Sequence, residues 1–111
     1  MSIDRLIVCG GRTFNDRARV WAALWELDPG IIFEGGAKGA DRLAAQWADF
    51  YRKKRARCEA EWQKFGPSAG PRRNRKMLSL KPVAVLAFPG GVGTGDMRAQ
   101  AYKAGVEIIQ R

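Results

Sequence analysis

The sequence contains no histidine and only two cysteines, Cys9 and Cys58. Structural zinc sites are built from four cysteine or histidine ligands, so this composition argues strongly against such a site. Both cysteines fall in segments that we expect to be strands, and we interpret them as small buried thiols. We therefore predict no metal site, and no motif identifies a cofactor.

Long hydrophobic runs are also missing. The longest are a handful of residues, such as residues 83–88, whereas a membrane-spanning helix needs about 20. The sequence does not open with a basic segment followed by an apolar one, as a secretory leader does. We therefore expect no membrane association and a cytoplasmic location.

Acidic residues are few compared with basic ones. Twenty Lys and Arg stand against eleven Asp and Glu, which gives a formal net charge of +9. The basic runs RKKRAR (52–57) and RRNRK (72–76) hold nine of the twenty cations. Such a surface attracts polyanions, namely nucleotides, nucleic acid or an acidic partner. The length of 111 residues suits one domain, which we take to be residues 1–111.

Short apolar segments alternate along the chain with segments of helical spacing. This order predicts an α/β fold, a three-layer Rossmann-like open parallel sheet of about five strands with helices on both faces. The loops that follow the strands then share one edge of the sheet, where such sheets bind ligands. We predict strands over 6–9, 31–33, 58–62, 83–88 and 106–109, and helices from Asn15 or Asp16 to about 27, over about 40–57 and 72–80, and from a cap at Thr94 to about 104.

Four loops are expected at this edge, three of them rich in glycine and one, at 66–74, basic. Glycine lets a ligand approach the backbone, and successive N–H groups at a helix N-terminus attract phosphate or carboxylate. The alternative is that the glycines only serve tight turns. The residues predicted to bind a ligand are Gly10, Gly11, Arg12, Gly35, Gly36, Lys38, Gly39, Asp41, Arg73, Asn74, Pro89, Gly90, Gly91, Gly93 and Thr94.

Two common nucleotide motifs are absent from these loops. No Lys-Ser/Thr pair follows the glycines, so there is no Walker A motif, and GGRTFN lacks the GxGxxG fingerprint. Ordinary ATP hydrolysis and ordinary NAD redox chemistry are therefore poorly supported.

Four segments together carry a family resemblance: VCGGRTFND, EGGAKGADRLAAQWA, EWQKFGPSAGPRRNRKM and AFPGGVGTGDMRAQAYKAG. In this order they resemble the YspA-type branch of the SLOG superfamily, which includes Lonely Guy phosphoribohydrolases and the DNA-processing protein A family. The resemblance covers nearly the whole chain. It implies a Rossmann-like fold and a site for nucleotides or their derivatives at the glycine-rich edge, and it implies no particular reaction.

The last of these segments departs from the Lonely Guy pattern PGGxGTxxE. There a glutamate takes part in breaking a ribose–base bond, whereas here the third residue after Thr94 is Met97. A thioether cannot orient water or stabilise an oxocarbenium-like centre. Asp96 is a candidate substitute, although one residue turns a side chain by about 100° around a helix. Its alternative role is to complement the helix dipole.

Three further residues are candidates for catalysis. Asp41 begins the second helix, where it either binds ribose hydroxyls or a ligand amine or complements the helix dipole. Glu34 ends the second strand and is a candidate replacement for the missing acid. Arg75, with Lys76, resembles the Arg-Lys pair of the Lonely Guy pattern, and Arg73-Asn74 resembles the Arg-Asn of this branch. An arginine here either clamps a phosphate or belongs to a solvated helix start.

Two other features bear on partners. Trp62 precedes the basic loop and is a candidate for stacking on a base, whereas Trp21, Trp25 and Trp47 have helical spacing and are expected in the core or an interface. The run at 52–57 is expected to end the second helix, at the edge opposite the loops, either as a solvated helix end or as a phosphate-contacting patch for nucleic acid. A homodimer is expected only by analogy with superfamily relatives.

These observations give three hypotheses, in this order. The first is binding or sensing of a nucleotide or nucleotide-derived ligand at the glycine-rich edge. The second is a nucleotide-processing hydrolase that acts on an N-glycosidic or phosphate bond, as Lonely Guy enzymes do. The third is binding of DNA or RNA, which the net charge of +9 supports.

Overall fold

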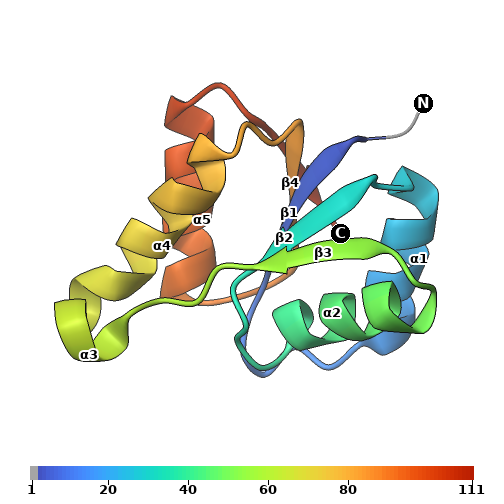
Figure 1. The fold of residues 1–111 in the computed structure, drawn as a ribbon, viewed down its shortest axis with the longest axis horizontal. Helices are drawn as coiled ribbons and strands as arrows, with labels where there is room; N and C mark the ends of the chain where they lie inside the picture. The colour runs from blue at the N-terminus through green and yellow to red at the C-terminus, as the bar shows by residue number, and fades with distance from the viewer. Residues whose placement is uncertain (1–2) are drawn as a thin grey trace.

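The computed structural model describes residues 3–111 (Figure 1). Within them the strands are β1 (Arg5–Cys9), β2 (Ile31–Glu34), β3 (Lys54–Arg57), β4 (Ala84–Ala87) and β5 (Glu107–Gln110). The helices are α1 (Arg17–Leu27), α2 (Ala40–Phe50), α3 (Trp62–Phe65), α4 (Ala69–Ser79) and α5 (Val92–Lys103), with a 3-10 turn, η1 (Gly66–Ser68), between α3 and α4.

The strands form a single parallel sheet in the order β3-β2-β1-β4-β5. In the central strand, Leu6 lies beside Ile32 on one side and Ala84 on the other. The strand order runs outward from β1 in both directions, so the chain reverses its direction of winding between β3 and β4. Ligands bind at such a reversal in open α/β sheets. The predicted fold class is confirmed.

Helices cover both faces of the sheet, as Figure 1 shows, with α1 and α2 on one face and α4 and α5 on the other. Side chains alternate along a strand, so Leu6 and Val8 pack toward α1 and α2, whereas Ile7 and Cys9 pack toward α4 and α5. Residues 6–9 of β1 are therefore buried between the two helix layers, which explains why they form an unbroken apolar run.

The third strand is not where the sequence predicted it. Helix α2 ends at Phe50 rather than near Arg57, and Arg52 adopts a left-handed backbone conformation with φ 55°. The strand that follows is β3, built from the basic run itself, and the predicted strand at 58–62 is wrong, because that segment leads into α3. Cys58 accordingly lies just after a strand, half-buried, while Cys9 lies buried in β1.

Carboxylates on neighbouring elements explain this basic strand. Arg55 is bonded to Asp49 of α2 and to Glu34 of β2, and Arg57 is also bonded to Glu34. These tertiary contacts override the helical preference of a Lys/Arg run. Strand β3 is an edge strand that runs parallel to β2. The basic run was expected to lie at the edge opposite the loops. It begins there, just after α2, but it crosses the sheet as β3, so Arg57 lies at the loop edge and the expectation is wrong for the end of the run.

Helix starts differ less from the predictions. Asp16 caps α1 as expected, since its Oδ1 accepts the N–H of Arg19 at 3.1 Å. Helix α4 begins at Ala69, before the predicted Arg72. Helix α5 begins at Val92 with Gly91 as its cap, so Thr94 lies in the first turn and is not the cap. The turn that leads into α5 contacts the loop after β1, because the Gly11 N–H donates to the Pro89 carbonyl.

Candidate functional site

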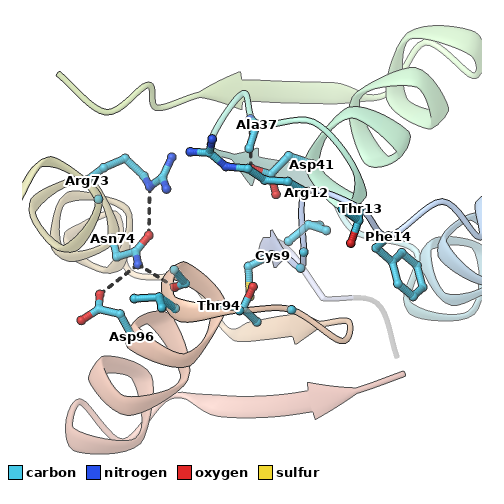
Figure 2. A pocket seen from close by; sticks show the side chains of 18 of the residues that line it. Cys9, Arg12, Thr13, Phe14, Ala37, Asp41, Arg73, Asn74, Thr94 and Asp96 are labelled. Carbon is cyan, nitrogen blue, oxygen red and sulfur yellow. Dashed lines mark hydrogen bonds between the residues drawn. The ribbon is translucent and has the colours of Figure 1, made fainter. Parts of the chain in front are cut away.

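A cavity of about 900 Å³ lies at the loop edge of the sheet (Figure 2). Its walls come from the loop after β1, from the loop after β2 and the start of α2, from α3 to α4, and from the loop after β4 with the start of α5. The loops after β1 and β4 are joined directly, since the Gly11 N–H donates to the Pro89 carbonyl at 2.8 Å. The topology thus gathers all four predicted loops around one hollow.

Most of the predicted binding residues line this cavity. They are Gly10, Gly11, Arg12, Asp41, Arg73, Asn74, Pro89, Gly90, Gly91, Gly93 and Thr94. Gly35, Gly36, Lys38 and Gly39 belong to the same loop as Ala37 but are not among the lining residues. Of the catalytic candidates, Asp41 and Asp96 line the cavity, whereas Glu34 and Arg75 do not.

The N-terminus of α5 presents backbone donors to the cavity. Its cap, Gly91, makes no side-chain capping bond. The N–H groups of residues 91–94 donate to no described residue, because the first bond of this helix is Gly95 N–H to the Gly91 carbonyl at 2.9 Å. Gly91, Gly93 and Thr94 all line the cavity. Free N–H groups and the positive end of the helix dipole favour an anion here.

Arg73 of α4 is fixed against the loop after β2. Its Nη1 donates to the Gly35 carbonyl at 3.1 Å, and its Nε donates to Asn74 Oδ1 at 2.9 Å. A side chain at position 35 would collide with this guanidinium, so only glycine allows so close an approach. No described residue accepts from Nη2, whose two N–H groups remain available to a ligand.

Asn74 links Arg73 to Asp96 across the cavity wall (Figure 2). The Asn74 Nδ2 donates to Asp96 Oδ2 at 2.9 Å and to the Gly93 carbonyl at 3.2 Å. Gln100, one turn later on α5, donates to the same Asp96 Oδ2 at 2.7 Å. One oxygen of Asp96 is thus held by two amides, while its Oδ1 accepts from no described residue.

Asp41 is the second carboxylate of the cavity, in the first turn of α2. Its Oδ2 accepts the N–H groups of Gly35 at 3.0 Å and Ala37 at 3.3 Å. Burial raises the pKa of Asp41 to about 6, and the hydrogen bond from Ala37, the Arg73 charge and the hydrogen bond from Gly35 offset only part of that effect. The Asp41 carboxyl group therefore changes its protonation state near pH 6.

Cys9 lies at the floor of the cavity, at the end of β1. Burial raises the pKa of its thiol to about 12, and the charge of Asp41 adds to the effect. The thiolate is the reactive form of cysteine, so Cys9 is not a nucleophile at neutral pH.

Glu34 is fully buried and turned toward strand β3. Its Oε2 accepts from Arg57 Nε at 2.9 Å and Arg55 Nη1 at 3.3 Å, and its Oε1 accepts the Gly36 N–H at 2.6 Å. Both oxygens are occupied by protein donors, so Glu34 acts as a structural ion-pair residue. Arg75 is exposed on α4 and has no contact with the cavity.

Met97 and Asp96 point to different sides of α5. Met97 is fully buried in the apolar cluster between the sheet and helices α4 and α5, with Met77 and Val85. Asp96 instead lines the cavity. The carboxylate nearest to the position of the Lonely Guy glutamate is therefore Asp96, one residue earlier in the sequence.

Several lining residues carried no signal in the sequence. Ala37 and Pro71 have no distinctive chemistry, and Phe14 packs on Phe88 with ring centroids 5.2 Å apart. Gln100 does not line the cavity but holds Asp96, and the sequence could have indicated this pair, because Gln100 lies four residues after Asp96 on one helix face. Over residues 3–111, no cluster of three or more His, Cys, Asp or Glu side chains is arranged to hold a metal ion, and no helix is long and apolar enough to cross a membrane.

Comparison with known proteins identifies the family. A family described as YspA, cpYpsA-related SLOG (YAcAr) matches residues 4–65, more than half of the chain. A Mycobacterium phage D29 protein, named Gene 61 protein, is 36% identical over 117 residues, which cover 95% of this chain and 94% of that protein.

A solved structure is similar in fold. DNA processing protein A (DprA) from Streptococcus pneumoniae matches with a TM-score of 0.50 and 17% identity, over 96% of this chain and 58% of that one. This chain thus spans little more than half of that protein, and the likeness concerns the fold alone. The family match and the phage relative show that the chain belongs to the YspA, cpYpsA-related SLOG family.

Proposed function

We propose that the cavity binds a nucleotide or nucleotide-derived ligand, with a phosphate at the N-terminus of α5. The observation that carries this proposal is the row of free N–H groups at residues 91–94, together with Thr94 in the same wall. Nη2 of Arg73 adds charged donors from the facing helix α4. Backbone donors at a helix start and a guanidinium are the groups that proteins use for phosphate.

The rest of the cavity suits the sugar. Asp96 Oδ1 accepts from no described residue and Asp41 lies in the opposite wall, so both carboxylates are suited to accept hydrogen bonds from ribose hydroxyl groups. The two carboxylates also balance the two arginines of the cavity, Arg12 and Arg73. A ligand with one anionic end and a hydroxyl-rich middle fits this distribution of charge.

The test is a thermal-shift screen combined with mass spectrometry. The purified protein is incubated with nucleoside mono-, di- and triphosphates, cyclic nucleotides and ADP-ribose derivatives. A ligand present at 100 times its Kd stabilises the fold by about 2.7 kcal/mol. Thr94→Val is expected to weaken a phosphorylated ligand about tenfold, because a hydrogen bond to a charged group is lost. Ser79→Ala, on the far end of α4, is the control. The proposal is wrong if no phosphorylated compound shifts the melting temperature.

Hydrolysis of the bound nucleotide is the second candidate, and Asp41 favours it. A carboxyl group with a pKa of about 6 suits general acid–base chemistry near neutral pH, and Asp96 supplies a second acid in the same cavity. The mass spectra of the same screen reveal any product. Turnover that Asp41→Asn abolishes while binding persists would support an enzyme, and binding without turnover would support a sensor.

Nucleic-acid binding is the third candidate, supported by the charge of +9 and by a fold shared with a protein named for DNA processing. Two cations of the run at 52–57, Arg55 and Arg57, are engaged by carboxylates. Arg52, Lys53 and Lys54 are left to contact phosphates. Salt-sensitive DNA binding that is lost when these three become Gln, without any nucleotide-induced shift, would favour this candidate.

A further inference from the structure

Trp62 and Arg12 form a pair at the cavity that the phosphate site does not use. Trp62 begins α3 and Arg12 lies in the loop after β1, and both line the cavity. The Arg12 guanidinium carbon lies 5.9 Å from the centroid of the Trp62 ring. Two flat groups from distant segments of the chain therefore meet across the opening.

Trp62 does not serve the core. Its side chain is 48% exposed, and α3 has no buried residue. Its closest glycine neighbour is Gly70 of α4, where an added Cβ would lie 3.2 Å from Cη2 and 3.9 Å from both Cζ2 and Cζ3. Helix α4 thus contacts the Cη2 end of the indole. The Arg12 guanidinium lies over the ring, and both side chains line the cavity.

The pair and the phosphate site lie on different sides of the cavity. Figure 2 shows Thr94 on one side and Arg12 on the other, with Cys9 between them. A nucleotide has the same arrangement, with its phosphate and its base separated by the ribose. If the phosphate lies at α5, its base reaches the side of Arg12 and Trp62.

We propose that Trp62 and Arg12 form a clamp that holds a nucleobase between an indole and a guanidinium, so that the site selects base-containing phosphates over sugar phosphates. This inference rests on the proposed function. A flat base held between two flat groups needs about 7 Å, twice an optimal contact of about 3.5 Å. The present distance is 5.9 Å, so Arg12 moves outward by about 1 Å. Arg12 is exposed on a loop and is free to do so.

Two kinds of probe, one with a base and one without, separate the clamp from the phosphate site. The four ribonucleoside 5′-monophosphates and ribose 5-phosphate are titrated by calorimetry at fixed ionic strength. Stacking of one base on one aromatic ring increases affinity about fivefold or more. We expect at least one monophosphate to bind more tightly than ribose 5-phosphate by this factor, and Trp62→Ala to remove the difference. Arg12→Lys keeps the charge but not the flat guanidinium, and should weaken the nucleotide only.

Trp25 provides a matched control. It is 47% exposed, nearly the same as Trp62, but it packs against Trp47 and Tyr51, away from the cavity. Nucleotide should quench tryptophan fluorescence in the wild type and in Trp25→Phe, and not in Trp62→Phe. Circular dichroism and thermal melting confirm that each variant is folded.

The outcomes are distinct. Equal affinity for the nucleotides and ribose 5-phosphate in the wild type overturns the clamp and leaves the phosphate site standing. Equal loss of nucleotide affinity in Trp62→Ala and Trp25→Ala also overturns the clamp. If none of these compounds binds, the clamp is overturned, and the proposed function fails with it only if no compound of the wider thermal-shift screen binds either.

Discussion

Glu34 and Arg57 lie opposite each other on neighbouring parallel strands, and Arg57 Nε donates to Glu34 Oε2 at 2.9 Å. Arg55 Nη1 reaches the same oxygen at 3.3 Å. The carboxylate is fully buried, whereas the side chains of Arg55 and Arg57 are 27% and 40% exposed. One buried acid thus holds two cations of an otherwise hydrophilic edge strand against the sheet.

This arrangement predicts that Glu34→Gln destabilises the fold and leaves ligand binding unchanged. The substitution weakens the hydrogen bonds from two arginines, and we expect it to lower the unfolding free energy by about 2 kcal/mol. The loss is no larger because both arginine side chains are partly exposed and regain water. Urea unfolding measures the loss, and the thermal-shift screen measures binding. Glu107→Gln, at an exposed position of β5, is the control and should change stability by less than about 0.5 kcal/mol. A Glu34→Gln protein with wild-type stability that no longer binds the ligand would show that Glu34 belongs to the site.

Asp41 predicts an unusual dependence of stability on pH. Its pKa is raised from 3.8 to about 6 in the folded protein, so between these values the folded state binds the proton more tightly than the unfolded state. The contribution of Asp41 to stability therefore falls as the pH rises through this window. Asp41→Asn removes this penalty, and its stability relative to the wild type should improve by about 2 kcal/mol between pH 4.5 and pH 8.

Urea unfolding of the wild type and Asp41→Asn at both pH values tests this prediction. Other carboxyl groups titrate in both proteins and cancel in the comparison. A stability difference that is the same at pH 4.5 and pH 8 would mean that Asp41 has an ordinary pKa.

Strands with apolar residues were predicted correctly from the sequence, whereas β3, which is built from basic residues, was not. Residues 6–9 and 84–87 are apolar because β1 and β4 are buried on both faces of the sheet, and the glycines after them mark the loops. Strand β3 has no apolar run, because only Ala56 packs on the core while Arg55 and Arg57 are paired with acids from other elements. Pairing between segments far apart in sequence leaves no local pattern.

The site was predictable to the level of loops but not of individual side chains. The edge of the sheet gathers the four loops whatever their side chains do. Which of Asp96 and Met97 faces the cavity depends on where α5 begins, and the predicted cap at Thr94 was three residues later than the observed cap at Gly91. The role of Glu34 depended on β3, whose position was predicted wrongly.

Met97 predicts that restoring the Lonely Guy glutamate by substitution will fail. Its side chain is fully buried with Met77, Val85 and Ala101. Met97→Glu places a carboxyl group among these apolar side chains, and we expect it to lower the unfolding free energy by more than about 3 kcal/mol. Met97→Leu conserves volume and should cost less than about 1.5 kcal/mol. A Met97→Glu protein with wild-type stability and hydrolase activity would show that this residue faces the cavity.

Cys9 and Cys58 predict selective alkylation. Both thiols are free, but Cys9 is buried with a pKa of about 12, raised from 9.0. This rise lowers the thiolate fraction about a thousandfold, and the greater nucleophilicity of a more basic thiolate recovers only part of it. Iodoacetamide at pH 8 should therefore modify Cys9 about 30-fold more slowly than a thiol with a pKa of 9.0. The less buried Cys58 should be modified first, as measured by peptide mass spectrometry. In Cys58→Ser, the remaining thiol should react slowly in the folded protein and faster after urea unfolds it. Equal rates for the two cysteines in the folded protein would mean that the cavity floor is open to the reagent and that Cys9 is a reactive thiol after all.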